Sequence, residues 1–281
     1  MMKWIFIGII FLSGLSLQAQ NFLSWQYNDR YFSAAFGTGQ SMYIGELNQP
    51  NRIQEDFSHW TLGLEARLLS KVSARVEAGL YHVRGRDRLA PDSSFQRQRN
   101  LSFDTYNFEM SIQGVFYMRK YRGDYYRRWP VDPYLALGVG FTTINPTTTL
   151  QETKYNLREI ATEDNSYGPV ALMLPAAAGI KFSINEFVNF NLEVAYRYTF
   201  TDYLDDVSTT FPESFPNTTA ELLSNRKDEI GVVNQDAYDR LVAGERRGDP
   251  DNNDQYLFLS MKLEIYLPRG SSPVIKKPEA N

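Results

Sequence analysis

Cysteine is absent from this chain of 281 residues, so disulfide bonds and thiolate ligands contribute nothing to its structure. Histidine is nearly absent, with 2 residues, and neither lies in a recognisable catalytic motif. Beyond residue 19 no apolar run reaches the roughly 18 residues that mark a transmembrane helix. The net charge of −4 gives no sign of a nucleic-acid-binding protein. What remains informative is the order of polar and apolar residues.

The first nineteen residues have the features of a secretory signal peptide. Lys3 supplies the positive charge, Trp4–Leu17 the mostly apolar segment, and Leu17-Gln18-Ala19 a cleavage site before Gln20. The apolar segment is shorter than the roughly 20 residues that a transmembrane helix needs. No Cys follows it that could carry a lipid. We therefore expect residues 1–19 to be removed and the remaining 262 (281 − 19) to be exported.

Strict alternation of apolar and polar residues is the strongest pattern in the exported part. In 255–267 every second side chain is aliphatic, and the intervening positions include Lys262 and Glu264. Successive side chains of a β-strand point to opposite faces, so this strand has one aliphatic face and one charged face. In a membrane barrel the aliphatic face meets lipid and the charges line the lumen. A soluble, lipocalin-like barrel has the two faces reversed.

The same alternation recurs along the chain. In 72–81, for example, Val72, Val76 and Leu80 share one face, while Arg75 and Glu77 share the other. The eight predicted strands are 31–45, 57–69, 71–84, 101–120, 132–145, 170–184, 187–200 and 255–267.

The connections between these strands alternate in length. They are tight at Ser70 and at Asn185-Glu186, of medium length at 121–131, and longer elsewhere, up to 201–254. Short turns on one side and long loops on the other are typical of outer-membrane barrels, whose short turns and termini lie in the periplasm. The aromatic content of 14% suits the aromatic girdles at both membrane interfaces. The predicted fold is an eight-stranded antiparallel transmembrane outer-membrane β-barrel of residues 20–268, with long extracellular loops and a short, flexible periplasmic tail, 269–281.

Charges of both signs fall on the inward face of the predicted strands. An eight-stranded barrel is only wide enough for its side chains to fill, so these charges must pair with one another. We expect a plugged, ion-paired lumen, and the alternative is a selective pore or proton path. The predicted network comprises Glu65, Arg67, Arg75, Glu77, Glu109, Glu193, Arg197, Lys262 and Glu264, and Arg119 and Lys181 share the inward-facing pattern.

A cluster of basic and aromatic residues lies in the medium-length connection, on the predicted periplasmic side. Two interpretations remain open. The cluster is either an interfacial girdle against lipid headgroups or a docking surface, because Arg, Tyr and Trp are the residues of binding hot spots. The candidate partner-binding residues are Arg122, Tyr125, Tyr126, Arg127, Arg128 and Trp129.

A few acids and one histidine fall near the predicted outer rim. His82, Asp87, Asp202, Asp205 and Asp206 are candidates for a membrane-enzyme site, but no motif links them. The spacing of the three aspartates after 201 matches no EF-hand-type loop. We therefore expect solvated acids and no catalytic, cofactor-binding or metal-binding site. Within the longest connection, 218–227 and 236–243 have helical patterns, with Thr218 and Thr219 as possible caps.

Five local strings carry a resemblance to a known family. They are Tyr43–Asn48 (YIGELN), Arg84–Asp87 (RGRD), Asn100–Phe103 (NLSF), Pro133–Gly140 (PYLALGVG) and Tyr198–Ser208 (YTFTDYLDDVS). In these strings, and over about residues 30–267, the chain resembles the PorG-like outer-membrane β-barrel proteins of Bacteroidota, which are linked to type IX secretion and gliding motility.

The resemblance implies a non-enzymatic protein of the Gram-negative outer membrane. Its implied role is a structural or docking subunit that connects the periplasmic ring complex of the type IX secretion system to the outer membrane. The implied partners are the ring lipoprotein and its partner protein, with outer-membrane lipid around the barrel and no nucleic acid. The alternative is a general surface barrel, of the adhesin or membrane-stabilising type, that acts through its long extracellular loops.

Overall fold

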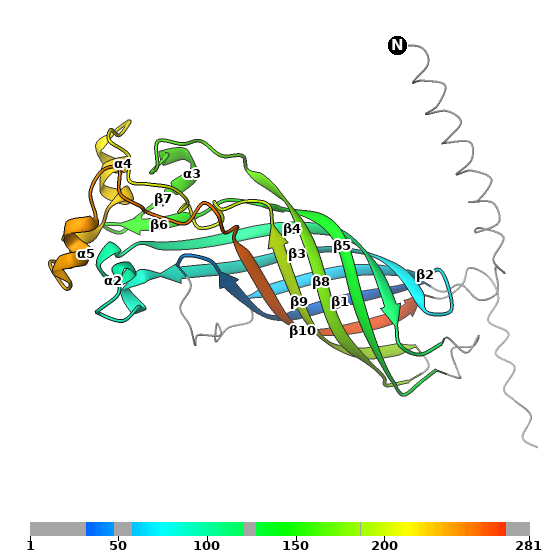
Figure 1. Ribbon diagram of the computed structural model, residues 1–281. Helices are drawn as coiled ribbons and strands as arrows, with labels where there is room; N and C mark the ends of the chain where they lie inside the picture. Colours follow the sequence, from blue (N-terminus) through cyan, green and yellow to red (C-terminus); the bar gives the residue numbers. More distant parts are fainter. Residues whose placement is uncertain (1–31, 48–57, 121–127, 186, 268–281) are drawn as a thin grey trace, which may run out of the picture.

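A computed structural model describes residues 32–47, 58–120, 128–185 and 187–267. Antiparallel strands pair in the order β3-β2-β1-β10-β9-β8-β5-β4, and the pairing of β3 with β4 closes the ring (Figure 1). The predicted eight-stranded barrel is thereby confirmed. Its strands are β1 (Phe32–Ile44), β2 (His59–Arg67), β3 (Val72–Arg86), β4 (Ser102–Tyr117), β5 (Val131–Thr143), β8 (Val170–Ser183), β9 (Val188–Thr199) and β10 (Gln255–Leu267).

The two faces of the wall follow from the alternation in the sequence. In β10 the side chain of Lys262 is buried in the lumen (2% exposed), while its neighbour Leu263 lies on the outer wall (46% exposed). Leu62, Leu137 and Leu172 also face outward, each about two-thirds exposed. Apolar surface costs about 25 cal/mol for each Å² left in water, so an outer wall covered with such residues needs lipid around it.

Glycine allows close strand contact on one side of the barrel. A Cβ atom added to Gly138 of β5 would lie 2.1 Å from the carbonyl oxygen of Ile112 in β4. Any larger residue there would push β5 away from β4 and disturb the hydrogen-bond ladder between them. The glycines of the PYLALGVG string therefore hold this part of the wall together.

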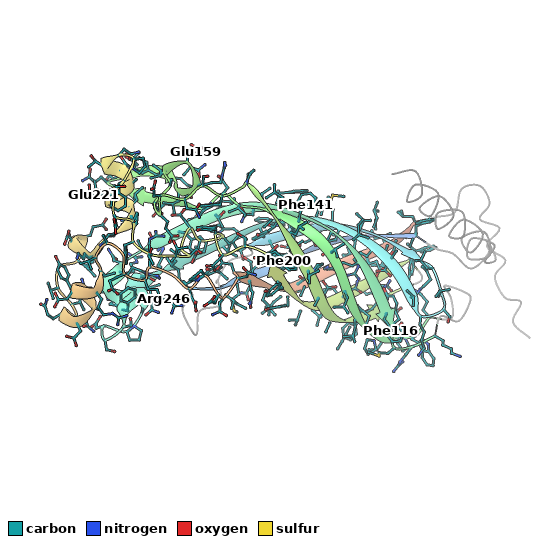
Figure 2. All side chains as sticks on the ribbon, turned by 45° about the horizontal axis from the view of Figure 1, so that its top comes forward. Phe116, Phe141, Glu159, Phe200, Glu221 and Arg246 are labelled. Atoms are coloured by element: carbon teal, nitrogen blue, oxygen red, sulfur yellow. The ribbon has the colours of Figure 1, made fainter. Side chains whose placement is uncertain are left out.

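The two ends of the barrel differ. One end, here named the short-turn end, carries the connections β2–β3, β4–β5 and β8–β9. The other, here named the capped end, carries the connections 87–101, 144–169 and 200–254, which contain every described helix (Figure 1). Figure 2 shows Glu159, Glu221 and Arg246 at the capped end and Phe116 toward the opposite one. The additional elements are η1 (Asp87–Leu89), α2 (Phe95–Arg99), β6 (Thr147–Leu150), β7 (Thr153–Asn156), α3 (Leu157–Ile160), α4 (Thr218–Ser224), η3 (Lys227–Glu229) and α5 (Gln235–Arg240).

Long strands lift the capped end away from the membrane. β3 has 15 residues and β4 has 16. At about 3.4 Å per residue each is roughly 50 Å long, whereas the hydrocarbon core is about 30 Å thick. The β6–β7 hairpin extends this sheet through the pairing of Thr147 with Asp104 of β4. None of the helices in the described ranges has the length and apolar composition to cross a membrane.

The helices of the longest connection agree with the sequence in position but not in capping. α4 and α5 overlap the predicted segments 218–227 and 236–243. The prediction of Thr218 or Thr219 as the cap is wrong, because the Asn217 side chain accepts the backbone N–H of Ala220 at 2.8 Å. Helices α2 and α3 and the β6–β7 hairpin were not predicted.

Several sequence predictions lie outside the described residues. These are the signal peptide 1–19, the tail 269–281, and four of the candidate partner-binding residues, Arg122, Tyr125, Tyr126 and Arg127.

Candidate functional site

The lumen contains a continuous series of ion pairs. Arg75 contacts Glu65 at 3.2 Å and Glu193 at 2.8 Å. Lys262 bridges Glu193, at 2.7 Å, and Glu77. All five side chains are at most 6% exposed, so their charges are neutralised by one another rather than by water.

The series continues toward both ends of the barrel. Arg197 contacts Glu109 at 2.9 Å and Glu77 at 3.5 Å, and Lys181 contacts Glu264 at 2.8 Å. Arg67, the remaining residue of the predicted network, lies over the ring of Tyr117 at 4.0 Å. The structure thus brings inward-facing charges from six strands into one network.

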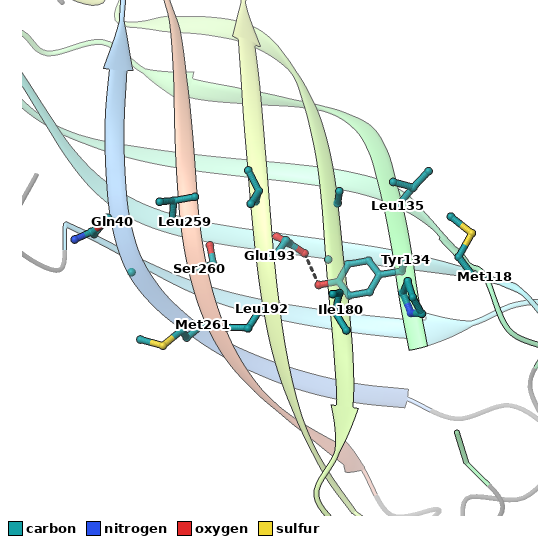
Figure 3. A pocket seen from close by; sticks show the side chains of 15 residues that line it. Gln40, Met118, Tyr134, Leu135, Ile180, Leu192, Glu193, Leu259, Ser260 and Met261 are labelled. Atoms are coloured by element: carbon teal, nitrogen blue, oxygen red, sulfur yellow. Dashed lines mark hydrogen bonds between the residues drawn. The ribbon is translucent and has the colours of Figure 1, made fainter. Parts of the chain in front are cut away.

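Aromatic side chains fill the rest of the lumen. Tyr81 stacks on Tyr256 at 4.5 Å, and both are at most 1% exposed. Figure 3 shows Tyr134 and Glu193 pointing toward one another, and the tyrosine hydroxyl donates to the carboxylate at 2.8 Å. The hollow in that view, about 730 Å³, lies against β5, β8, β9 and β10, where Ala178 and Gly179 make the wall thin. Its lining is mostly apolar, as a lipid-facing surface requires.

A serine–histidine contact inside the lumen escaped the sequence analysis. His59 Nε2 lies 2.9 Å from Ser260 Oγ, and the imidazole ring stacks on Phe258 at 4.4 Å. Within the part of the chain that the structure describes, His59 Nδ1 has no hydrogen-bond partner, so no described acid orients the ring as a catalytic base requires. Both residues are buried, and the pair therefore acts in packing.

At the short-turn end, Arg128 joins the β4–β5 connection to the β8–β9 connection and to the end of β10. Its guanidinium donates to the side chain of Asn189 and to the backbone carbonyl of Asn185. The same group lies over the ring of Tyr266 at 4.5 Å. Arg128, a candidate partner-binding residue, thus also has a structural role within the barrel.

Trp129, the other described candidate for partner binding, lies against an exposed cation. Its indole N–H donates to the carbonyl of Lys120 at 3.1 Å, and the guanidinium of Arg119 lies 4.8 Å from its ring. Arg119 does not face the lumen as the alternation predicts, because β4 ends at Tyr117 and the chain turns outward. Arg119, Lys120 and Trp129 together form a cationic and aromatic patch, here named the collar.

Buried arginines hold the capped end together. Arg99 makes a two-pronged contact with Asp87, at 2.7 and 3.0 Å, and donates to the carbonyl of Arg247 at 2.5 Å. Arg247 donates to Glu163 at 2.7 Å and to the carbonyl of Asp206 at 2.5 Å. These residues come from the connections 87–101, 144–169 and 200–254, so the arginines fasten these three loops to one another.

Four carboxylates gather beneath this part of the cap. Tyr43, at the end of β1, donates its hydroxyl to Asp205 at 2.7 Å and to Asp254. Asp202 and Glu46 lie beside them. The space is tight, because a Cβ atom at Gly45 would lie 1.9 Å from the Tyr43 hydroxyl. We name Glu46, Asp202, Asp205 and Asp254 the carboxylate cluster.

Burial and mutual repulsion change the titration of this cluster. Burial, together with the charge of Asp202, raises the pKa of Glu46 to about 7. Burial is also the main cause that raises the pKa of Asp202 to about 8; Ser208 moderates the rise and the charge of Asp205 adds to it. The pKa values of Asp205 and Asp254 are raised well above their usual range by burial and by neighbouring carboxylates.

The acids and the histidine predicted at the rim occupy different places. His82 contacts Asp104 at 3.0 Å and stacks on Tyr106 at 4.1 Å on the outer wall. Asp87 pairs with Arg99. Asp206 accepts from Thr162 and Tyr167. Of the rim group, only Asp202 and Asp205 belong to the carboxylate cluster.

Sequence reasoning missed Glu46 and Asp254 in that cluster and Glu163 and Arg247 in the cap. Glu46 stands in the YIGELN string, which is the one signal that singled it out. The other three lie in long connections without periodicity, where a charged residue is usually solvated. Only the pairing of β1 with β10 and of β10 with β9 brings the ends carrying Glu46, Asp202 and Asp254 together.

A closed antiparallel barrel with an apolar outer wall and an ion-paired lumen defines a class of protein. In lipid every backbone hydrogen bond must be satisfied internally, which a closed barrel achieves. The alternation apolar-out and polar-in, with short turns at one end and long connections at the other, is that of outer-membrane barrels. The chain is a β-barrel of the outer-membrane type.

Comparisons with solved structures found barrels of the same class. The chain is similar to Neisserial surface protein A, with a TM-score of 0.40 and 10% identity over 84% of this chain and 96% of that one. It is similar to Ail of Yersinia pestis (TM-score 0.40, 10% identity, 85% and 99% covered). It is also similar to a major outer membrane protein of Thermus thermophilus (TM-score 0.40, 12% identity, 85% and 99% covered). At TM-scores of 0.40 the similarity to these structures supports no argument, so the fold is assigned from the strand pairing of this chain. No family model and no curated protein matches the chain.

Proposed function

We propose that this barrel is a non-enzymatic subunit of the type IX secretion system, anchoring the periplasmic ring complex to the outer membrane. The observation that carries the proposal is the filled lumen. The ion-paired series from Glu65 to Glu109 and the buried tyrosines occupy the lumen, which supports a barrel that acts through its two end surfaces. The assignment to this particular machine rests on the PorG-like strings YIGELN and YTFTDYLDDVS.

The collar is the proposed contact with the ring. Arg119 and Lys120 are exposed, and Trp129 is half-buried under the Arg119 guanidinium. Arg and Trp are enriched in binding hot spots because they combine a large apolar area with directional donors. Because Arg128 fixes the neighbouring connections, the collar is held in place before a partner arrives.

Affinity purification of a tagged copy from the native outer membrane tests the proposal. We expect the ring lipoprotein to co-purify with the wild-type barrel. The double variant Arg119→Glu/Trp129→Ala should lose that recovery by at least about tenfold, since one hot-spot residue contributes roughly 2 kcal/mol or more. Lys154→Glu, an exposed cation of β7 at the capped end, is the matched control and should retain the lipoprotein. Both variants must keep the heat-modifiable mobility of a folded barrel. Purification of the wild-type barrel without any ring protein contradicts the proposal.

A second function is favoured by a specific feature of the capped end. A cleft of about 960 Å³ lies between the β3–β4 strand ends, the β6–β7 hairpin and residues 226–230. Cationic side chains outnumber acidic ones in it, which suits an anionic surface ligand; its cations are Arg86, Arg88, Arg97, Lys154 and Arg226. If the barrel acts on the cell surface through this cleft, the two variants should exchange their effects. Lys154→Glu would then lose surface binding, and the collar variant would keep it.

A further inference from the structure

Three carboxylates converge at the mouth of the barrel, beneath the cap. Glu46 follows β1, Asp202 follows β9, and Asp254 precedes β10. One oxygen atom from each lies within 4.8 Å of the other two. Two oxygens on opposite sides of a Ca²⁺ ion, at 2.3–2.6 Å from it, are about 4.6–5.2 Å apart. The three oxygens therefore lie close enough together to contact one hard cation.

Asp202 is the residue that points to a ligand. The residue is 6% exposed, and among the described residues neither of its carboxylate oxygens accepts a hydrogen bond within 3.5 Å; the Ser208 hydroxyl is the neighbouring donor whose influence lowers its pKa against the rise that burial causes. Oε2 of Glu46 is also buried without a partner. A buried carboxylate without a partner costs several kcal/mol, so buried charges are normally paired or bound to metal.

The cations of the cap do not neutralise the cluster. Arg99 is the guanidinium whose charge acts on Glu46 and Asp205, yet its own donors go to Asp87 and to the carbonyl of Arg247. Among the described residues no Lys or Arg forms an ion pair with Glu46, Asp202 or Asp254. The described residues therefore supply no cation for this excess negative charge, which a bound cation or protons on the carboxylates would balance.

The surrounding hydrogen bonds orient the ligands. Asp254 accepts Tyr43 on Oδ1 and the backbone N–H of Leu204 on Oδ2, at 2.8 Å in the latter case. The Glu46 Oε1 atom accepts the backbone N–H of Asp249 at 2.9 Å, which leaves Oε2 toward the cluster. Each of these carboxylate oxygens still has a lone pair for a cation, and hydrogen bonds of this kind hold a metal-binding carboxylate in position.

We propose that Glu46, Asp202 and Asp254 bind a hard divalent cation of the calcium type. All three donors are carboxylate oxygens, which suit Ca²⁺ or Mg²⁺ and not softer metals. A set of three carboxylates favours Ca²⁺, because Mg²⁺ demands near-ideal octahedral geometry, keeps several waters and is usually held by only one or two carboxylates. The ion joins the connection 200–254 to the end of β1 and so anchors the cap to the barrel.

Calorimetric titration of the purified full-length barrel with CaCl₂ tests the site. We expect about one Ca²⁺ per chain with a Kd of roughly 10⁻⁴–10⁻³ M, the range of extracellular calcium modules. Asp202→Asn should weaken binding by at least about tenfold. Asp251→Asn, which removes an equal charge from an exposed position of the same connection, should bind as the wild type does. A parallel titration with MgCl₂ should show weaker binding.

A measurement on the wild-type protein alone avoids dependence on the folding of the variant. Hydrogen exchange of peptides within 200–254 should slow by about 10–100-fold in 10 mM CaCl₂ relative to a chelator. This factor is the ratio of the Ca²⁺ concentration to the expected Kd, roughly 10–100, by which a ligand stabilises the state that binds it. The exchange of the β4 and β5 strands should not change. The proposal is overturned if the wild type binds no Ca²⁺ up to 10 mM, if Asp202→Asn binds it equally well, or if calcium leaves the exchange unchanged.

Discussion

Replacement of Arg247 by methionine tests whether buried ion pairs hold the cap together. Arg247 is 3% exposed and donates to Glu163 at 2.7 Å, to the carbonyl of Asp206 at 2.5 Å, and to that of Ser224 at 3.2 Å. Methionine keeps much of the volume and removes the charge and every donor. The change therefore isolates the polar contacts from the packing.

The free-energy cost of Arg247→Met depends on how many hydrogen bonds Glu163 keeps after the guanidinium is removed. Removal of one partner of a buried ion pair costs about 3–5 kcal/mol. Glu163 keeps three other donors, from Ser208 and Thr209, so the lower value applies. Since each 1.4 kcal/mol is a factor of ten, about 3 kcal/mol raises the opened fraction of the cap roughly 100-fold.

Hydrogen–deuterium exchange in detergent measures this opening, because protected amides exchange in proportion to the opened fraction. Peptides from 157–164 and 201–254 should exchange roughly 100-fold faster, and those from the barrel strands should not change. Arg246→Met is the control. That side chain is 60% exposed and pairs with Asp249 at the surface, where a pair contributes at most about 1 kcal/mol. Equal exchange in the two variants, or loss of protection throughout the barrel, would refute the reasoning.

Two further predictions concern the pH response of the cap and the lumen. Burial alone raises the pKa of Glu163, but Arg247 and the Ser208 amide outweigh it and hold this pKa below its ordinary value of 4.5. The ionised Glu163 therefore stabilises the wild-type cap relative to Glu163→Gln fully above pH 4.5, and this stabilisation is lost as the pH falls through the pKa of Glu163 in the folded protein. Hydrogen exchange of the cap peptides, measured in both proteins as a function of pH, tests this. A difference that stays constant down to pH 2 would contradict this. Lys262→Ala leaves Glu77 and Glu193 without their shared cation and should destabilise the barrel by about 3–5 kcal/mol, seen as a lower temperature of the heat-modifiability transition. Lys154→Ala, exposed on β7, should leave that temperature unchanged, and equal transitions would argue against a structural role for the network.

The barrel strands were predictable because a membrane wall imposes the same alternation on every strand. β10 is the clearest case, and its bounds agree with the predicted 255–267. The fourth strand was predicted to run to residue 120 but ends at Tyr117. The alternation in the sequence continues through Arg119, whereas the pairing with β5 stops at Tyr134 opposite Tyr117. Periodicity locates a strand, but its end depends on the partner strand.

The elements of the cap could not be predicted, because they show no repeated alternation. Helix α2 has 5 residues, α3 has 4, and β6 and β7 have 4 each, which is too short for either period to stand out. Their stability comes from contacts far apart in the chain, such as that of Arg99 with the carbonyl 148 residues away. No local pattern records such a contact.

The candidate site shows the same limit within one string of residues. Asp202, Asp205 and Asp206 are neighbours in the sequence, and their spacing gave no ligand pattern. In the structure Asp206, with a φ of 70°, turns toward Thr162, while Asp202 meets Glu46 and Asp254. The grouping depends on the order of strands β1, β10 and β9 around the barrel, which the alternation does not specify.

The two proposed functions differ in which end of the barrel binds the partner: the collar at the short-turn end or the cleft at the capped end. The buried ion pairs and tyrosines of the lumen favour a barrel that acts through its end surfaces rather than as a channel. At the short-turn end the collar is small but fixed by Arg128, whereas the capped end is built from three connections fastened by Arg99 and Arg247. Burial of the arginine charges in this cap is offset by the pairs of Arg99 with Asp87 and of Arg247 with Glu163. The collar and Lys154 variants separate a contact made at the short-turn end from one made at the capped end.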